Sequence, residues 1–83
     1  MKLIMDDRVY TADTAVALID EIKGEHWSCT KNTTAEEYIG IMVDTHKRMT
    51  GKVMDLSGDI EAQAIGMFEI VAKTGAWQFT KEE

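Results

Sequence analysis

Apolar and polar residues follow two different periods along this chain. Near both ends they alternate with a period of two, which is typical of half-buried strands. Between these ends, apolar residues recur every three or four positions, which is typical of amphipathic helices. Glycines at positions 24, 51, 58 and 75 separate one periodic segment from the next.

The opening segment, KLIMDDRVYT, has β-rich runs on both sides of two aspartates and therefore predicts a tight hairpin. A loop of two or four residues places Ile4 opposite Val9 and Leu3 opposite Tyr10. A three-residue loop shifts that register and changes which face is buried. The sequence alone leaves the choice of loop open.

Three helices are predicted in the middle of the chain, each with one apolar face. These faces comprise Ala12, Ala15, Val16, Ile19 and Ile22 in the first helix, Ile39, Met42, Val43, His46 and Met49 in the second, and Ile60, Ala64, Met67, Phe68 and Val71 in the third. The expected N-caps are Thr11 or Asp13, then Thr33 or Thr34 in a capping box with Glu36 or Glu37, and finally Ser57. The expected helix ends are Gly24 in the left-handed conformation, Gly51, and Lys73 before Gly75.

The final strand is predicted in AWQFT, where Trp77 and Phe79 share one side and Gln78 and Thr80 the other. The resulting order is β-β-α-α-α-β in a single domain spanning residues 1–83. An isolated hairpin is only marginally stable, so the last strand is expected to pair with it. We therefore expect an α+β fold, with a small antiparallel-rich three-stranded sheet and three helices packed on one face.

Charge argues against nucleic-acid binding. Nine basic residues stand against fifteen acidic ones, giving a net charge of −6. Binding to a phosphate backbone depends on lysine and arginine, so we expect no nucleic-acid partner. The densest basic cluster is His46, Lys47, Arg48 and Lys52. It lies at a predicted helix end, where cations offset the helix dipole.

Residues that could carry chemistry are few. The histidines and the single cysteine are His26, Cys29 and His46, which is too few for a defined zinc site without an added carboxylate. Trp27 better explains the loop around His26 and Cys29, as an aromatic anchor. His46 lies on an apolar stripe and is interpreted as a packed histidine. We expect no catalytic residue, no metal site and no cofactor.

No apolar run approaches the ~20 residues that cross a bilayer, and the N-terminal segment reaches two acids too early for a signal peptide. A single cysteine permits no internal disulfide and fits a reducing compartment. We therefore expect a cytoplasmic protein with no membrane contact.

Four segments carry a resemblance to known sequences: the start KLIMDDRVYTADTAVALIDEIK, the aromatic loop at Trp27, the helix opening TAEEYIGIM, and the strand AWQF. In this layout the chain resembles short uncharacterised proteins of bacterial and bacteriophage genomes. The resemblance spans most of the chain and implies a similar fold and an origin in a mobile element. It implies no activity.

The expected function is that of a small acidic, non-enzymatic interaction or accessory protein. A homodimer or another protein partner is expected to dock on the sheet face formed by Ile4, Val9, Gln78 and Thr80, or on a sheet edge. The alternative is an acidic nucleic-acid mimic that inhibits a DNA-binding enzyme. Its supporting residues are Asp6, Asp7, Asp13, Asp20, Glu21 and Glu25.

Overall fold

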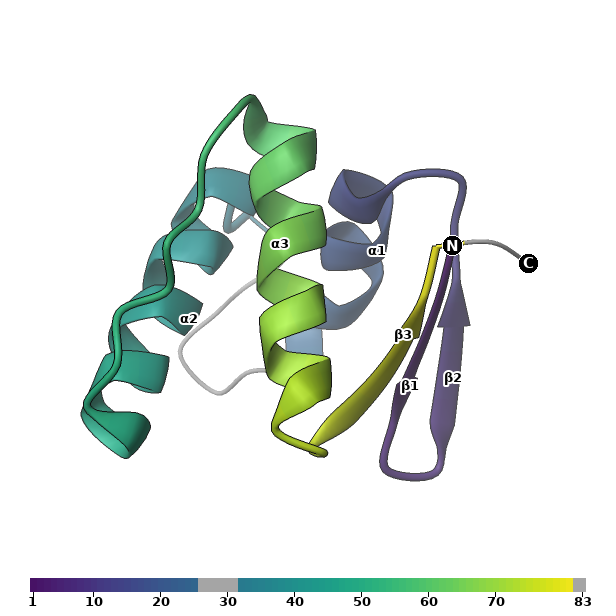
Figure 1. The fold of residues 1–83 in the computed structure, drawn as a ribbon. Helices are drawn as coiled ribbons and strands as arrows, with labels where there is room; N and C mark the ends of the chain where they lie inside the picture. Colours follow the sequence, from purple (N-terminus) through teal and green to yellow (C-terminus); the bar gives the residue numbers. More distant parts are fainter. Residues whose placement is uncertain (26–31, 82–83) are drawn as a thin grey trace.

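The computed structural model describes residues 1–25 and 32–81 of the chain. Within this described part, a three-stranded antiparallel sheet with strand order β2-β1-β3 forms one layer, and three α-helices cover one face of it (Figure 1). The α+β order predicted from the sequence is confirmed, with one short 3-10 helix in addition. The elements are β1 (Lys2–Met5), β2 (Arg8–Thr11), α1 (Ala15–Ile22), η1 (Lys23–Glu25), α2 (Ala35–Thr50), α3 (Ile60–Lys73) and β3 (Trp77–Thr80).

The hairpin of β1 and β2 has a two-residue turn, and its register is the one predicted for an even loop. Ile4 lies opposite Val9, and Leu3 lies opposite Tyr10. Asp6 adopts a left-handed φ of 54° in the turn, a conformation that aspartate tolerates better than most non-glycine residues. This register directs Leu3 toward the helices and turns Ile4 to the other face.

α3 lies between α2 and β3 in Figure 1 and contacts every layer of the fold. On its sheet side, the Phe68 ring packs at a tilt against Phe79, with centroids 5.1 Å apart, and against Trp77 at 6.2 Å. The aromatic strand β3 is thereby fixed against the helix layer. The buried core comprises Leu3, Ala15, Leu18, Ile19, Ile22, Tyr38, Ile39, Met54, Ala64, Met67, Phe68 and Val71.

The start of α1 differs from the prediction. Thr14 is the N-cap, and its hydroxyl accepts a hydrogen bond from the Ala17 N–H at 3.1 Å. Thr11 and Asp13 were the expected caps, and both are wrong. The sheet ladder continues through Ala12, whose N–H donates to the Met1 carbonyl at 3.0 Å, and the backbone is still extended at Thr14, with φ of −134° and ψ of 160°. The helix can begin only after that bond. Its buried face accordingly includes Leu18, which the predicted stripe omitted, while Val16 is half-buried.

A carboxylate from α3 provides a second cap for α1. The two oxygens of Glu61 accept hydrogen bonds from the Ala15 and Val16 N–H groups, at 2.7 and 3.0 Å. The first N–H groups of a helix have no partner within it, and a carboxylate there also meets the positive end of the helix dipole. The Glu61 side chain therefore links α3 to the backbone at the start of α1.

The remaining helix ends combine confirmed and wrong predictions. α2 begins with a complete capping box between Thr34 and Glu37 and ends at Gly51 with φ of 74°, as predicted. α3 is capped by Asp59 and not by Ser57, because Gly58 adopts φ of 93° and so cannot belong to a right-handed helix. Gly24 is not left-handed, since the chain continues directly into η1.

Candidate interaction surfaces

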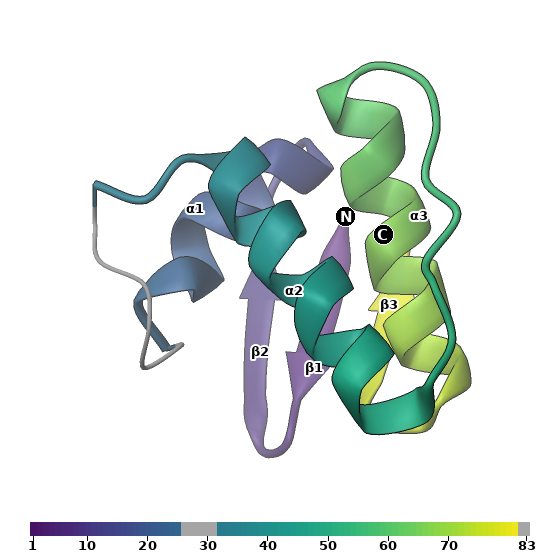
Figure 2. The ribbon, with the colours of Figure 1, turned by 90° about the vertical axis from the view of Figure 1, so that its left-hand side faces the viewer.

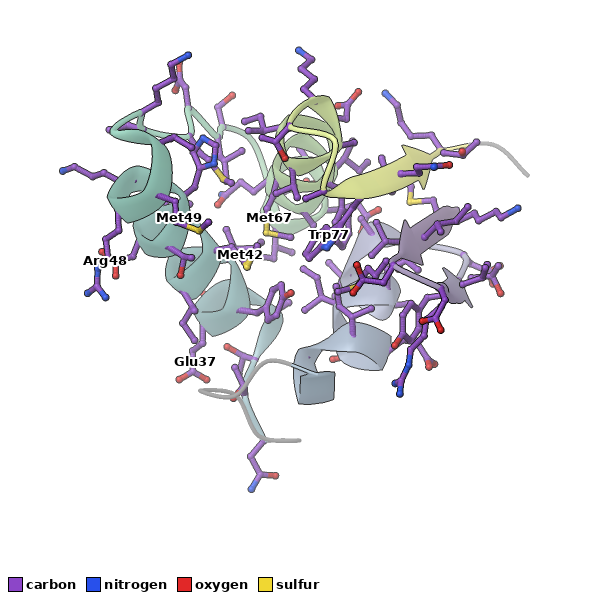
Figure 3. All side chains as sticks on the ribbon, turned by 90° about the horizontal axis from the view of Figure 1, so that it is seen from below. Glu37, Met42, Arg48, Met49, Met67 and Trp77 are labelled. Carbon is purple, nitrogen blue, oxygen red and sulfur yellow. The ribbon has the colours of Figure 1, made fainter. Side chains whose placement is uncertain are left out.

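An apolar cavity of about 240 Å³ opens between the second half of α2, the connection after it, and the junction of α3 with β3. In Figure 3, Met42 and Met49 on one side and Trp77 on the other lie around this space. We call it the methionine cavity. Its lining residues are Met42, Thr45, His46, Met49, Thr50, Met54, Val71, Thr74, Ala76 and Trp77.

Helical periodicity gathers one wall of the cavity. The α2 positions that line the cavity are linked by spacings of three and four residues, so they share one helix face. They are positions 42, 45, 46, 49 and 50. The opposite wall comes from the end of α3 and the start of β3. Met54, on the connection between α2 and α3, is buried and contributes to the floor together with Val71. Figure 2 shows this connection running back along α3 from the end of α2.

One lining residue of the cavity is a highly exposed apolar side chain. Met49 is 81% exposed, whereas Val53, on the other side of the turn at Gly51, is 65% exposed and is not a lining residue. The prediction that Met49 belongs to the core stripe is wrong, because the stripe of α2 faces the cavity at this end of the helix. Met42, Val43 and His46 are accordingly only half-buried.

Two of the three threonines that line the cavity, Thr50 and Thr74, donate hydrogen bonds to the backbone. The Thr50 hydroxyl donates to the His46 carbonyl at 2.8 Å, and the Thr74 hydroxyl donates to the Val71 carbonyl at 2.6 Å. The Val71 carbonyl also accepts the Thr74 backbone N–H at 3.1 Å, so the Thr74 hydroxyl is a second donor to it. The interior of the cavity is therefore apolar in character despite its threonines.

Charged residues near the lining residues in sequence are of both signs. The basic ones are Lys47, Arg48, Lys52 and Lys73, and the acidic ones are Asp44, Asp55 and Glu69. Arg48 pairs with Asp44 at 2.9 Å and points away from the cavity in Figure 3.

The second candidate surface is the open sheet face, formed by the four residues predicted from the sequence. Ile4 lies between Val9 and Gln78 on the neighbouring strands, and Thr80 lies opposite Lys2 on the same face. Val9 is 56% exposed, Gln78 and Thr80 are exposed, and Ile4 is half-buried. The predicted facing of these residues is confirmed, and their role in binding stays a prediction.

The proposed loop chemistry cannot be placed, because His26, Trp27 and Cys29 lie outside the described residues. His46 lines the methionine cavity. Over residues 1–25 and 32–81, no group of three or more histidine, cysteine, aspartate or glutamate side chains is arranged to hold a metal ion.

Neither helix length nor relatives add a functional assignment. No helix in the described part of the chain is both long and apolar enough to span a membrane. Comparison of the chain with protein-family models, curated protein sequences and solved structures gave no match. The two candidate surfaces therefore have to be judged on their own geometry.

Proposed function

We propose that this chain is a small, non-enzymatic interaction protein that binds a protein partner at the methionine cavity. The observation that carries the proposal is an apolar cavity whose lining includes Met49, a side chain that is 81% exposed. Methionine and arginine are enriched at protein interfaces, and flexible methionine side chains adapt to the shape of a partner.

Energetics favour this use of the surface. Burying one methionine or valine side chain contributes about 1.5–3 kcal/mol, and Met49 and Val53 leave most of that contribution unused in the isolated chain. The cavity also offers a concave site, into which a partner can insert an anchor side chain away from water. The open sheet face has exposed Val9, and the hollow of about 260 Å³ beside Ile4 and Gln78 is lined mainly by polar surface.

The open sheet face is the second part of the proposal, as a site of self-association. Both outer strands, β2 and β3, have an edge that another chain can extend by strand addition. A homodimer through this face or edge, a cytoplasmic location and a mobile-element origin all stay predictions. The homodimer prediction is independent of the methionine cavity, because the open sheet face and the cavity share none of their residues.

The acidic nucleic-acid mimic is the alternative function. Its named acids lie in different parts of the fold: Asp6 and Asp7 in the hairpin turn, Asp13 before α1, and Asp20 and Glu21 within α1. A mimic must present its charges as one surface in order to occupy a basic cleft. The methionine cavity is a single continuous site, and we rank the interaction protein first for that reason.

Affinity capture with matched variants tests the proposal. One variant, Met42→Gln with Met49→Gln, replaces two apolar lining residues of the cavity. The control variant, Ile4→Gln with Val9→Gln, removes the apolar part of the open sheet face. We expect the purified main partner to bind the control variant with nearly unchanged Kd and the cavity variant at least about tenfold more weakly. If the partner binds the cavity variant and the wild type with the same Kd, the proposal is wrong. If that partner is also a nuclease that DNA displaces, the acidic nucleic-acid mimic becomes the favoured function.

A further inference from the structure

We infer that the methionine cavity is also a binding site for a soft monovalent metal ion, Cu(I), with the sulfur atoms of Met42, Met49 and Met54 and one imidazole nitrogen of His46 as its ligands. Such a site does not depend on the proposed function, because a metal ion and the anchor side chain of a partner are alternative occupants of one cavity. It departs from the expectation of no metal site, which was reached by considering zinc ligands.

The donor atoms that line the cavity are soft. Three of its lining residues are methionines and one is a histidine. Thioether sulfur selects Cu(I) among the metals that proteins bind, and imidazole nitrogen is a good copper ligand as well. Among the described residues that line the cavity, none carries a carboxylate, the donor on which magnesium and calcium depend. The lining therefore favours a soft ion over a hard one.

Helix α2 places three of these donors at spacings that metal sites use. Met42 and His46 are four residues apart, and His46 and Met49 are three residues apart. Side chains at these spacings are neighbours on one helix face, with Cβ atoms about 5–6 Å apart. Ligand pairs at the same spacings on one helix hold zinc in metalloproteases and iron in helix bundles. In Figure 3, the side chains of Met42 and Met49 point from α2 toward α3 and Trp77.

The fourth donor comes from a different element of the fold. One helix face supplies ligands from one side only, so a closed coordination shell needs a donor from elsewhere. Met54, on the connection after α2, lines the same cavity and is only 5% exposed. A methionine side chain is unbranched and has three rotatable bonds, so its sulfur can turn toward a shared point. Binding of the ion therefore draws the methionine side chains into the cavity by changes of rotamer.

An apolar cavity with one open side suits a singly charged ion. Thioethers and metal-bound imidazole are neutral, so the loaded site holds a single positive charge, and burying one charge costs less than burying two. The Trp77 side chain also lines the cavity, and an indole face attracts a cation. Met49 is 81% exposed, so the ion can enter from solvent at this ligand.

Anaerobic titration with Cu(I) tests the site on the full chain, with a colorimetric Cu(I) chelator as competitor. We expect Met42→Leu to raise the Kd at least about tenfold, because leucine keeps the apolar volume and removes the sulfur. Met49→Leu should do the same at an exposed position where the fold is not at risk. The matched control is Met5→Leu, at a half-buried methionine of β1, and its Kd should be unchanged. All variants carry Cys29→Ser, because a thiolate binds Cu(I) by itself.

The possible results separate the metal site from the proposed function. If Met42→Leu and Met5→Leu bind Cu(I) with the same Kd, or if Cys29→Ser alone abolishes binding, the cavity is not a copper site and the inference is wrong. The proposed function then stands, because its own test measures a protein partner. If Zn(II) displaces Cu(I) at equal concentration, the site does not select a soft ion and the inference is also wrong. If Cu(I) binds as expected and the purified main partner binds the loaded chain with unchanged Kd, the metal site stands and the proposed function is wrong.

Discussion

The two sides of α3 are built differently. On the sheet side, Leu3 and Phe68 are fully buried, and the aromatic side chains of β3 pack directly on the helix. On the α2 side, the helix is covered near Tyr38 and Ile39 but faces an open cavity toward its C-terminal end. The same helix therefore supports a filled core on one side and an incompletely filled one on the other. We expect the sheet side to contribute more to stability, and the cavity on the α2 side carries the proposed binding site.

The largest expected effect comes from the filled side. Phe68→Ala should destabilise the protein by about 3–5 kcal/mol, because it removes a fully buried ring and leaves a cavity beneath β3. Met42→Ala, at the half-buried cavity wall, should cost clearly less. Urea denaturation followed by circular dichroism measures both. Phe68→Leu supplies a milder variant if the alanine variant does not fold, and equal losses at positions 42 and 68 would contradict the comparison.

The next effect concerns the link between α3 and α1. Glu61→Ala should cost about 1–2 kcal/mol, since two helix N–H groups lose a charged acceptor. Glu61→Gln should lose less, because an amide retains one acceptor oxygen. Glu69→Ala on the same helix is the control, since its exposed pair with Lys81 at 3.4 Å is worth at most about 1 kcal/mol. Equal destabilisation by the two alanine variants would show that the Glu61 cap is not special.

The fold was more predictable from the sequence than the binding site was. The register of the hairpin, the Thr34–Glu37 capping box and the end of α2 at Gly51 depend on neighbouring residues, and each was readable in the chain. The cap of α1 was not, because Glu61 reaches it from 45 and 46 residues away. The methionine cavity was missed for a similar reason, as its wall combines α2, Met54 and β3. Six methionines in so short a chain were its one visible signal.

A smaller effect is expected at the open sheet face. Ile4→Lys with Val9→Glu should change stability by no more than about 1 kcal/mol, because the pair is at most a cross-strand contact on the outer face. If the face mediates self-association, light scattering should show a dimer for the wild type and a monomer for the variant. If the wild type stays monomeric at high concentration and the variant keeps its partners, the open sheet face is not an interaction surface.

The smallest effect is the pH dependence of the α2 cap. Hydrogen bonds from Thr34 lower the pKa of Glu37 from its ordinary value of 4.5. The larger effect comes from the Thr34 backbone N–H and the smaller one from the Thr34 side chain. The folded state therefore favours ionised Glu37, and this stabilisation is fully present above pH 4.5 and is lost as the pH falls through the lowered pKa. The difference in urea midpoint between wild type and Glu37→Gln should shrink as the pH is reduced from neutral toward that range. The adjacent Glu36→Gln variant is the control, and an unchanged difference for Glu37→Gln would contradict the assignment.

The most direct test of the account uses the methionines themselves. Three of the six, Met42, Met49 and Met54, line the methionine cavity, whereas Met1, Met5 and Met67 lie elsewhere and serve as internal controls. The protein is labelled with ¹³C at the methionine methyl groups and titrated with the purified main partner. We expect the methyl signals of the three cavity methionines to shift together while those of the other three stay in place. Shifts at Met1 and Met5, with the cavity methionines unchanged, would place binding at the sheet and contradict it.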